Sequence, residues 1–331
     1  MFLDFKKISD KFHEWSEDME QVPVVGKWIR KSKTLTLPGF QKMPLYDVMR
    51  FFMQSLGKGV VFQRAAAITY RIFVALIPMI IGLFTVVAYL GEDIQQTLLD
   101  FLESAVPTYV WPAIQNMITE VITRQYGALT SVMFVVGIYF TIVLINSLLV
   151  AMNSSYFNET RRNILKQILL SAMIMLITFG VILVVVALFI AASLIMKYVH
   201  THIFGTNTGY FIAVHGMKWI LTYVSIYFLI SILYYLAPVE KTNYKFFSAG
   251  SSLATILMVL LLWILNVYFS HFSNYNLIYG SLGAIFAILL WINWSSVILL
   301  VGYDLNVSIA KAKLAKDETV SPDHEMQLPS V

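Results

Sequence analysis

Long apolar runs constrain the fold of this chain more than any other feature. The clearest is 284–301, which is almost wholly apolar and is followed by a single carboxylate, Asp304. Because an α-helix rises about 1.5 Å per residue, about 20 apolar residues cross the roughly 30 Å hydrocarbon core of a bilayer. Comparable runs lie upstream, at 65–90, 128–152, 168–196, 219–236 and 249–269. The sequence therefore predicts an all-α integral membrane protein with about six transmembrane helices.

The composition supports this class and excludes others. Of the 331 residues, 58% are hydrophobic and 13% are charged, whereas ordinary soluble domains have about 25% charged residues. The chain has no cysteine, which excludes a disulfide framework and a thiolate metal site. The net charge of +4 could suggest nucleic acid, but the basic residues gather on one predicted side of the membrane. We therefore expect no nucleic-acid partner.

The distribution of Lys and Arg predicts the topology. The region before the first span and the segments that follow the second, fourth and sixth spans are basic. The loop after the first span has Arg124 alone, and the loop after the fifth has no Lys or Arg. Because cytoplasmic loops carry the excess of these residues, both termini are expected in the cytoplasm. The acidic segment 91–127 is then expected to form amphipathic helices on the outer side.

The chain divides into three predicted regions. They are a cytoplasmic amphipathic N-terminal region and linker at 1–44, a six-helix membrane domain at 45–310, and a basic, then disordered, cytoplasmic tail at 311–331. In the first region, Phe5, Ile8 and Phe12 have helical spacing, which favours an amphipathic helix over 1–21. Prolines and glycines over 22–44 are typical of a linker.

Four segments carry a family resemblance. They are RAAAITYRIFVALIP from Arg64, AMNSSYFNETRR from Ala151, LYYLAPVEKTNYKFFSAG from Leu233 and YGSLGAIFAILLWINWSSVILLVGYDLN from Tyr279. In this order and spacing the chain resembles the YihY/virulence factor BrkB family of bacterial inner-membrane proteins, over roughly 45–310. The resemblance implies a six-span helical domain in the bacterial cytoplasmic (inner) membrane.

The resemblance also bears on function. Members of the family are described as transporters or envelope factors, some are linked to lipid export, and the family was once mislabelled ribonuclease BN. The chain departs from the family pattern at Tyr70-Arg71, where two tyrosines are usual, and at Asp304, where glutamate is usual. The first departure puts a conventional pocket in doubt, and the second keeps the charge.

Two arginines in the first span are candidate substrate-binding residues. Arg64 and Arg71 are seven residues apart and so share a helix face, about 10 Å apart along the axis. A guanidinium at membrane depth needs a partner or water, because it cannot lose its charge. We hypothesise that both line a path for an anionic head group. Alternatively, Arg71 pairs with Asp304 and Arg64 only reaches the interface.

Asp304 is the acid at the edge of the last span, and two roles are open for it. It is either one half of an ion pair that tethers helices or a site that couples a proton or ion. The candidate partners for the ion pair are Arg64, Arg71, Arg161 and Arg162.

Asparagines in the spans are the remaining polar candidates. Asn146 and Asn293 could bind a polar ligand, although interhelical hydrogen bonds are an alternative for both and for Asn266. Tyr139, Asn146 and Asn153 recur every seven residues, so this stripe is expected to face the bundle or a wet cavity.

Three residues are candidate hinges. Pro78 interrupts the hydrogen bonding of the first span, and Gly280 and Gly283 precede or open the last one. A tight turn into the last span is the alternative for the two glycines.

Enzymatic motifs are missing from the sequence. There is no HExxH, GxSxG or Walker loop, and His200, His202 and His215 lack acidic neighbours for a metal site. We therefore expect neither an enzyme nor a cofactor or metal. The sequence favours a transporter or flippase for an anionic or lipid-like envelope component, with membrane lipids as partners. The alternative is a non-transporting scaffold for envelope-assembly proteins, and the sequence leaves the oligomeric state open.

Overall fold

The computed structural model of the chain describes residues 31–36, 39–56, 60–87, 91–105, 111, 115–116, 118–120, 128–154, 162–199, 208–239, 245–271 and 281–320. Over these residues the protein is helical, and β-structure is limited to one isolated bridge between Thr36 and Pro44. The long helices are α3 (Leu45–Leu56), α4 (Val60–Val87), α5 (Glu92–Ala105), α7 (Ala128–Asn153), α8 (Ile164–Val199), α9 (Thr208–Leu236), α10 (Ala249–His271) and α12 (Ser281–Val320). The predicted all-α class is confirmed. The predicted helix at 1–21 lies outside the described residues.

Five of the described helices are long and apolar enough to cross a membrane, which confirms the integral membrane class. Their candidate spans are Phe134–Asn153, Ile164–Leu188, Trp219–Leu236, Ala249–Tyr268 and Ile285–Lys316. Each coincides with a span predicted from the sequence. The other predicted span, 65–90, falls on the 28-residue helix α4, which contains Pro78. The side of the membrane that holds the termini stays a prediction.

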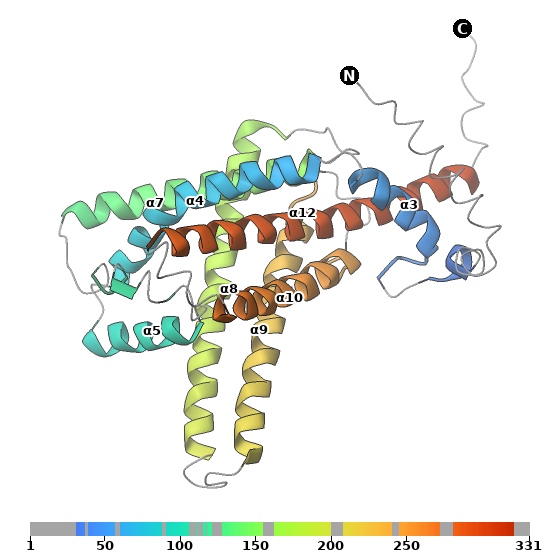
Figure 1. The fold of residues 1–331 in the computed structure, drawn as a ribbon. Helices are drawn as coiled ribbons and strands as arrows, with labels where there is room; N and C mark the ends of the chain where they lie inside the picture. Colours follow the sequence, from blue (N-terminus) through green and yellow to red (C-terminus); the bar gives the residue numbers. More distant parts are fainter. Residues whose placement is uncertain are drawn as a thin grey trace.

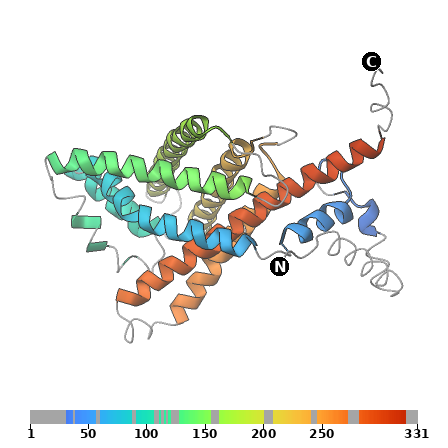
Figure 2. The same ribbon diagram turned by 90° about the horizontal axis from the view of Figure 1, so that it is seen from above.

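The helices form two groups that differ in direction. Helices α4, α7, α10 and α12 run broadly alongside one another, whereas the α8–α9 hairpin runs across them and extends away (Figures 1 and 2). Within the first group, α4 packs on α7 and α12, and α10 packs on α12. The hairpin leaves most of its apolar surface uncovered, since 11% of the α8 span and 17% of the α9 span is buried. Such a surface suits contact with lipid tails.

Small residues bring α10 and α12 into backbone contact. A Cβ added to Gly250 would lie 2.1 Å from the Gly302 carbonyl oxygen, and one added to Gly302 would lie 2.8 Å from the Cβ of Ala254. Larger side chains at either glycine would push the helices apart, because small residues are what allow membrane helices to approach so closely.

Polar groups also hold the start of α10 against α12. The Ser248 hydroxyl accepts a hydrogen bond from the backbone N–H of Ser251 at 3.1 Å, which caps the helix. Asn306 of α12 accepts from the N–H of Gly250 at 2.8 Å and donates to the Ser248 hydroxyl at 2.9 Å. These contacts use N–H groups that the first turn of a helix cannot pair internally.

The segment before α3 folds back onto the membrane domain. Gly39 has a φ of 86°, and a Cβ there would meet the backbone N of Ala249 at 3.2 Å. The turn buries Phe40 and Met43 in a cluster with Val48 of α3. The far side of this cluster comes from α12, through Leu305, Ile309 and Ala312. The end of the segment predicted as a linker is therefore packed.

Helix α12 continues well past the predicted last span. Its 40 residues correspond to about 60 Å at the usual helical rise. The predicted tail at 311–331 therefore begins as helix, and only 321–331 lies outside the described residues. Residues 309–316 are rich in Ala and Lys, which favour helix, and Ala312 is buried beside α3.

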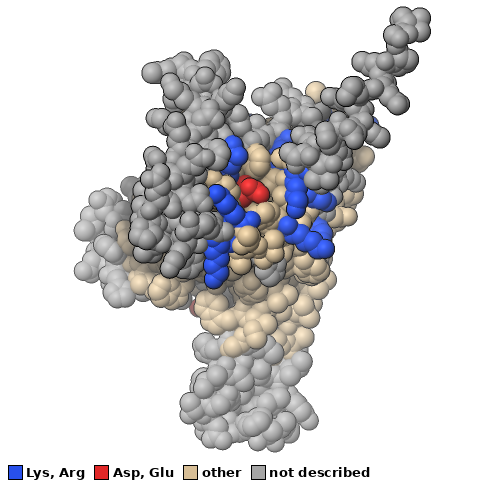
Figure 3. All heavy atoms as spheres, turned by 90° about the vertical axis from the view of Figure 1, so that its right-hand side faces the viewer, with Lys and Arg blue, Asp and Glu red and all other residues tan. Residues whose placement is uncertain are grey.

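Charge separates along the bundle. Lys and Arg gather on the face formed by α3 and the end of α12, around a small acidic patch (Figure 3). At this end α3 carries Arg50, and α12 carries Lys311, Lys313 and Lys316. The acidic helix α5 lies at the opposite end of the α4–α7 pair (Figure 1). The predicted topology depends on this separation.

Candidate functional site

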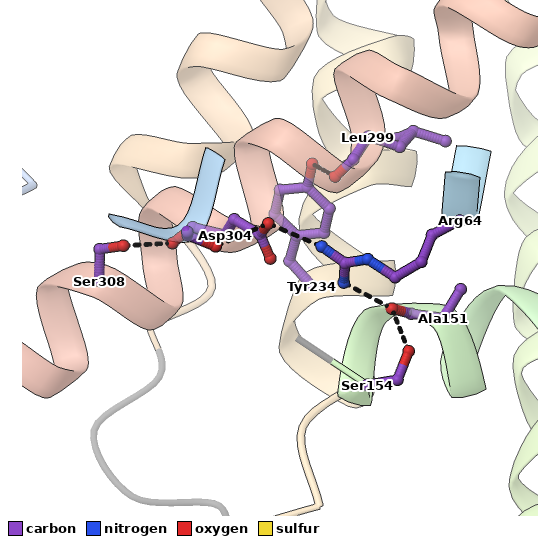
Figure 4. A network of polar contacts seen from close by, with 8 residues as sticks. Arg64, Ala151, Ser154, Tyr234, Leu299, Asp304 and Ser308 are labelled. Carbon is purple, nitrogen blue, oxygen red and sulfur yellow. Dashed lines mark hydrogen bonds and ion pairs between the residues drawn. The ribbon is translucent and has the colours of Figure 1, made fainter. Parts of the chain in front are cut away.

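The candidate site is built around a buried ion pair between α4 and α12. Arg64 Nη2 lies 2.9 Å from Asp304 Oδ2, and the two side chains are 10% and 0% exposed (Figure 4). The Ser55 hydroxyl of α3 donates to the same carboxylate oxygen at 3.0 Å. Of the partners that the sequence left open for Asp304, the structure pairs it with Arg64. Arg161 lies outside the described residues.

The Arg64 guanidinium also contacts α7. Arg64 Nη1 donates to the Ala151 carbonyl at 2.8 Å, and the Ser154 hydroxyl donates to that carbonyl at 3.1 Å (Figure 4). Ala151 lies in the last turn of α7, where carbonyl groups lack helical partners and form the negative end of the helix dipole. One charged group therefore joins α4 to α7 and α12, and Ser55 adds α3.

Arg64 and Asp304 each have a polar atom that makes no hydrogen bond among the described residues. The contact is monodentate, and Arg64 Nε and Asp304 Oδ1 are buried without a hydrogen-bond partner among the described residues. Arginine and carboxylate often meet as a bidentate fork, and a buried unpaired polar group costs about 1–3 kcal/mol. Among the described residues, the ion pair thus leaves one donor and one acceptor without a hydrogen bond.

Arg71 lies seven residues after Arg64 on α4, also beside α7, but its side chain is exposed. Its Nη1 donates to the Ser147 hydroxyl of α7. Ser147 and Ala151 are four residues apart on α7, so both arginines line the boundary between α4 and α7. Asp304 is the only acid in the sequence of α4, α7, α8, α9, α10 and residues 281–316 of α12. Since Asp304 pairs with Arg64, the alternative that it neutralises Arg71 does not describe this structure.

The two asparagines proposed as ligand-binding residues lie apart from each other. Asn293 donates to the Thr69 hydroxyl at 3.2 Å across the α4–α12 contact. This is the interhelical hydrogen bond that the sequence offered as the alternative to ligand binding. Asn146 Oδ1 is buried without a partner among the described residues. Thr69 is buried while Arg71 is exposed, so Asn293 and Arg71 lie on different sides of α4. The four candidate residues therefore do not converge on one point.

The predicted polar stripe on α7 is wrong for one of its members. Tyr139 is 62% exposed, so it points away from the bundle. Asn153 is buried and Asn146 is half-buried. A spacing of seven residues places side chains on one face of an isolated helix, but the neighbouring helices decide which positions on that face are covered.

A second polar network, missed in the sequence, caps α9 beside the ion pair. Asn153 Nδ2 donates to the Ala237 carbonyl at 2.8 Å, and its Oδ1 accepts from the N–H of Val239 at 3.2 Å. Arg162 donates to the carbonyls of Ala237 and Pro238. Burial lowers the pKa of Arg162, but a guanidinium remains charged.

Two tyrosines lie beside the polar network that caps α9. The Tyr303 hydroxyl lies 3.5 Å from Asn153 Oδ1, and the Tyr234 hydroxyl donates to the Leu299 carbonyl at 2.6 Å (Figure 4). The two rings pack edge to face, with their centroids 5.8 Å apart. Segments far apart in the sequence, beginning at Arg64, Ala151, Leu233 and Tyr279, therefore meet at one end of the bundle.

The hinge candidates have simple placements. Pro78 is half-buried inside α4, and Figure 1 shows that the second half of this helix bends away from the first. Gly283 lies in the first turn of α12, while Gly280 lies outside the described residues. Their role in motion stays a prediction. Within the described part of the chain, no three His, Asp or Glu side chains gather as metal ligands.

The long apolar helices and the charged contacts that join their ends define a multi-pass α-helical membrane protein. The family described as virulence factor BrkB matches residues 52–326. The chain therefore belongs to the virulence factor BrkB family, as the resemblance predicted.

Several curated relatives match at low identity over most of their length. A ribonuclease-like protein of Bacillus subtilis, YfkH, is 23% identical over 77% of this chain and 92% of its own. A UPF0761 membrane protein of Aggregatibacter aphrophilus is 24% identical over 80% of this chain and 92% of its own. Another, from Haemophilus influenzae, is 26% identical over 73% of this chain and 87% of its own. No solved structure matches the chain.

Proposed function

We propose that this protein is a non-enzymatic transporter of the bacterial inner membrane, which moves an anionic, lipid-like component of the envelope. The observation that carries the proposal is the charge of Arg71, which has no acidic partner among the described residues. This residue is exposed on α4, in which residues 72–87 carry no charge and are almost wholly apolar. Its described contact is to the neutral Ser147 hydroxyl.

The location of Arg71 favours a ligand over a structural partner. It lies eleven residues into α4, or about 16 Å from the start of the helix, which is near the middle of a bilayer if the helix starts at its surface. A guanidinium there requires an anion or water. Asp304, the sole acid of these helix segments, is buried and paired with Arg64. A second copy of the chain would have the same acid engaged, so we propose that a bound anion supplies the counter-charge.

The exposure of Arg71 also favours a particular class of ligand. Gln63, Ala67 and Tyr70 are exposed on neighbouring positions of α4, so the arginine opens toward the bilayer. An amphipathic anion can place its head group on this polar strip while its tails stay in lipid. Arginine binds phosphate and carboxylate groups with matched geometry. A phosphate-bearing lipid therefore fits better than a small, fully hydrated solute.

The experiment is a lipid-movement assay in proteoliposomes of neutral phosphatidylcholine that contain a fluorescent anionic phospholipid. Wild type, Arg71→Gln and Arg71→Lys are compared, with Lys166→Gln as a matched control because Lys166 is an exposed cation at the start of α8. We expect wild type and Lys166→Gln to move the anionic lipid, and Arg71→Gln to lose this movement. Equal movement by Arg71→Gln and wild type would contradict the proposal.

The scaffold alternative has one observation in its favour. Helix α12 extends past the span and, together with α3, forms a packed projection. Such a surface could hold an envelope-assembly protein. If purified wild type moves no anionic lipid and captures a partner through α3 and the end of α12, the scaffold replaces the transporter.

A further inference from the structure

We propose that Arg64 is a second anion-binding position, which Asp304 occupies in this structure as a built-in competitor of the ligand. The ligand would be a phosphate group, either of a lipid head group or of free phosphate. This inference rests on the proposed function, because it extends the anion path that begins at Arg71. It assigns to Asp304 a regulatory role in addition to holding helices together.

The geometry of the ion pair carries the proposal. Asp304 contacts Arg64 through one oxygen and one nitrogen, Oδ2 and Nη2. Arg64 Nε, on the same edge of the guanidinium, is buried without a hydrogen-bond partner among the described residues. A phosphate offers several oxygens and can engage Nε and Nη2 together, as bidentate arginine contacts do. The carboxylate therefore makes fewer hydrogen bonds to the Arg64 guanidinium than a phosphate could make.

The carboxylate is also held by few other contacts. The Ser55 hydroxyl donates to Oδ2 at 3.0 Å. Oδ1 is buried and has no partner among the described residues. A carboxylate whose second oxygen is unpaired loses fewer hydrogen bonds on displacement than a fully bonded one. Displacement of Asp304 by a ligand is therefore cheaper than for an ordinary buried bidentate pair.

The two arginines lie in the order that a moving anion requires. Arg71 is exposed and contacts Ser147 of α7, whereas Arg64 is nine-tenths buried and contacts Ala151 one helical turn farther along. Along α4 they are about 10 Å apart. For a head group bound at Arg71, Arg64 is therefore the next cation along α4. Asp304 already occupies that cation in this structure. The Asp304 carboxylate therefore competes with the phosphate for Arg64.

The test is equilibrium binding to the full-length protein in nanodiscs of phosphatidylcholine. Inorganic phosphate and the short-chain lipid dihexanoyl phosphatidic acid are titrated separately into wild type, Asp304→Asn and the double variant Arg64→Lys/Asp304→Asn. We expect Asp304→Asn to tighten binding of at least one probe roughly tenfold or more, since close charge pairs couple by about 1.5 kcal/mol upward. The double variant should lose this gain, because lysine cannot form the bidentate contact.

The two probes separate the sources of the phosphate. Tighter binding of phosphatidic acid alone identifies a lipid head group, and tighter binding of both identifies the phosphate group itself. Unchanged or weaker binding of both probes by folded Asp304→Asn overturns the inference. If Asp304→Asn does not fold, Ser55→Ala provides the test, because it loosens the carboxylate without removing a charge. A smaller gain of the same sign is then expected, and wild-type affinity overturns the inference.

The failure of this inference can be distinguished from the failure of the proposed function. If lipid movement is absent but Asp304→Asn binds phosphate more tightly, the transporter is wrong and the binding position at Arg64 stands. If lipid movement depends on Arg71 but Asp304→Asn binds as wild type does, the transporter stands and Asp304 is a structural partner alone.

Discussion

Arg64 and Asp304 lie 240 positions apart in the sequence and meet at 2.9 Å between α4 and α12. The contact forms where α3 supplies Ser55 and the last turn of α7 supplies the Ala151 carbonyl. One end of the bundle is therefore joined by charge, whereas the hydrophobic core between the helices is apolar and α10 meets α12 through small residues. The contributions of the two charges to stability are unequal, because Asp304 is wholly buried and Arg64 is not.

The first prediction concerns this inequality. Arg64→Gln should lower the free energy of unfolding by about 3–5 kcal/mol, because it leaves a buried carboxylate without a cation. Asp304→Asn should cost less, since Arg64 is partly exposed and keeps the Ala151 carbonyl. The double variant Arg64→Gln/Asp304→Asn should recover much of the loss. Equilibrium unfolding in mixed micelles measures all three, and a double variant less stable than Arg64→Gln would contradict the pairing.

The second prediction concerns the contact between α10 and α12. Gly250→Ala and Gly302→Ala should each lower stability by about 1–3 kcal/mol or more, as overpacking does. The Cβ added to Gly250 would lie 2.1 Å from the Gly302 carbonyl oxygen, and the one added to Gly302 would lie 2.8 Å from the Ala254 Cβ. Gly180→Ala is the control, since a Cβ there meets nothing within 4 Å. Thermal unfolding in detergent should separate the three. A Gly250→Ala variant as stable as Gly180→Ala would show that these helices do not touch.

Composition and apolar periodicity were sufficient to predict the class of fold and the positions of the described spans. A run such as 219–236 has few stable alternatives to a helix that faces lipid, so the local sequence decides the outcome. The length of α12 was missed, because its extension is amphipathic and is held by contacts with α3. Such contacts are not visible in the sequence of α12 alone.

The candidate site was only partly predictable for the same reason. Arg64 and Asp304 stood out because a charge beside an apolar span is costly wherever it points. Their pairing depends on where α4 crosses α12. The sequence alone allowed any of four arginines as the partner of Asp304. Ser55 gave little signal, since a hydroxyl near the end of a helix is common, whereas the seven-residue spacing of Asn153 predicted that it faces the bundle, where it is buried. The role of Ser55 follows from its contact with the Asp304 carboxylate, and that of Asn153 follows from the end of α9 that it contacts.

The third prediction concerns the cap of α9. Asn153→Leu should lower stability by about 2–3 kcal/mol, because it leaves the Val239 N–H and the Ala237 carbonyl without their buried partner. Ser154→Ala, one residue later, is the control, since its exposed hydroxyl bonds only within its own helix turn among the described residues. Thermal unfolding compares the two. Equal stability of the two variants would contradict the role assigned to Asn153.

The fourth prediction separates the two asparagines that the sequence proposed for the ligand. Asn293→Leu should lower stability by about 0.6 kcal/mol, the average for an interhelical hydrogen bond in a membrane. The Thr69 hydroxyl keeps its bond to the Ala65 carbonyl at 2.8 Å, which limits the loss. Asn146→Leu should leave stability unchanged or raise it, because it removes a buried oxygen that has no partner among the described residues.

The same pair of variants then tests function in the lipid-movement assay. If the unpaired Asn146 oxygen is kept for a ligand, Asn146→Leu should slow movement of the anionic lipid while the protein remains as stable as wild type. Asn293→Leu should move lipid at nearly the wild-type rate, because its amide is engaged with Thr69. The reverse result would assign the ligand to the α4–α12 contact and leave Asn146 as a packing residue.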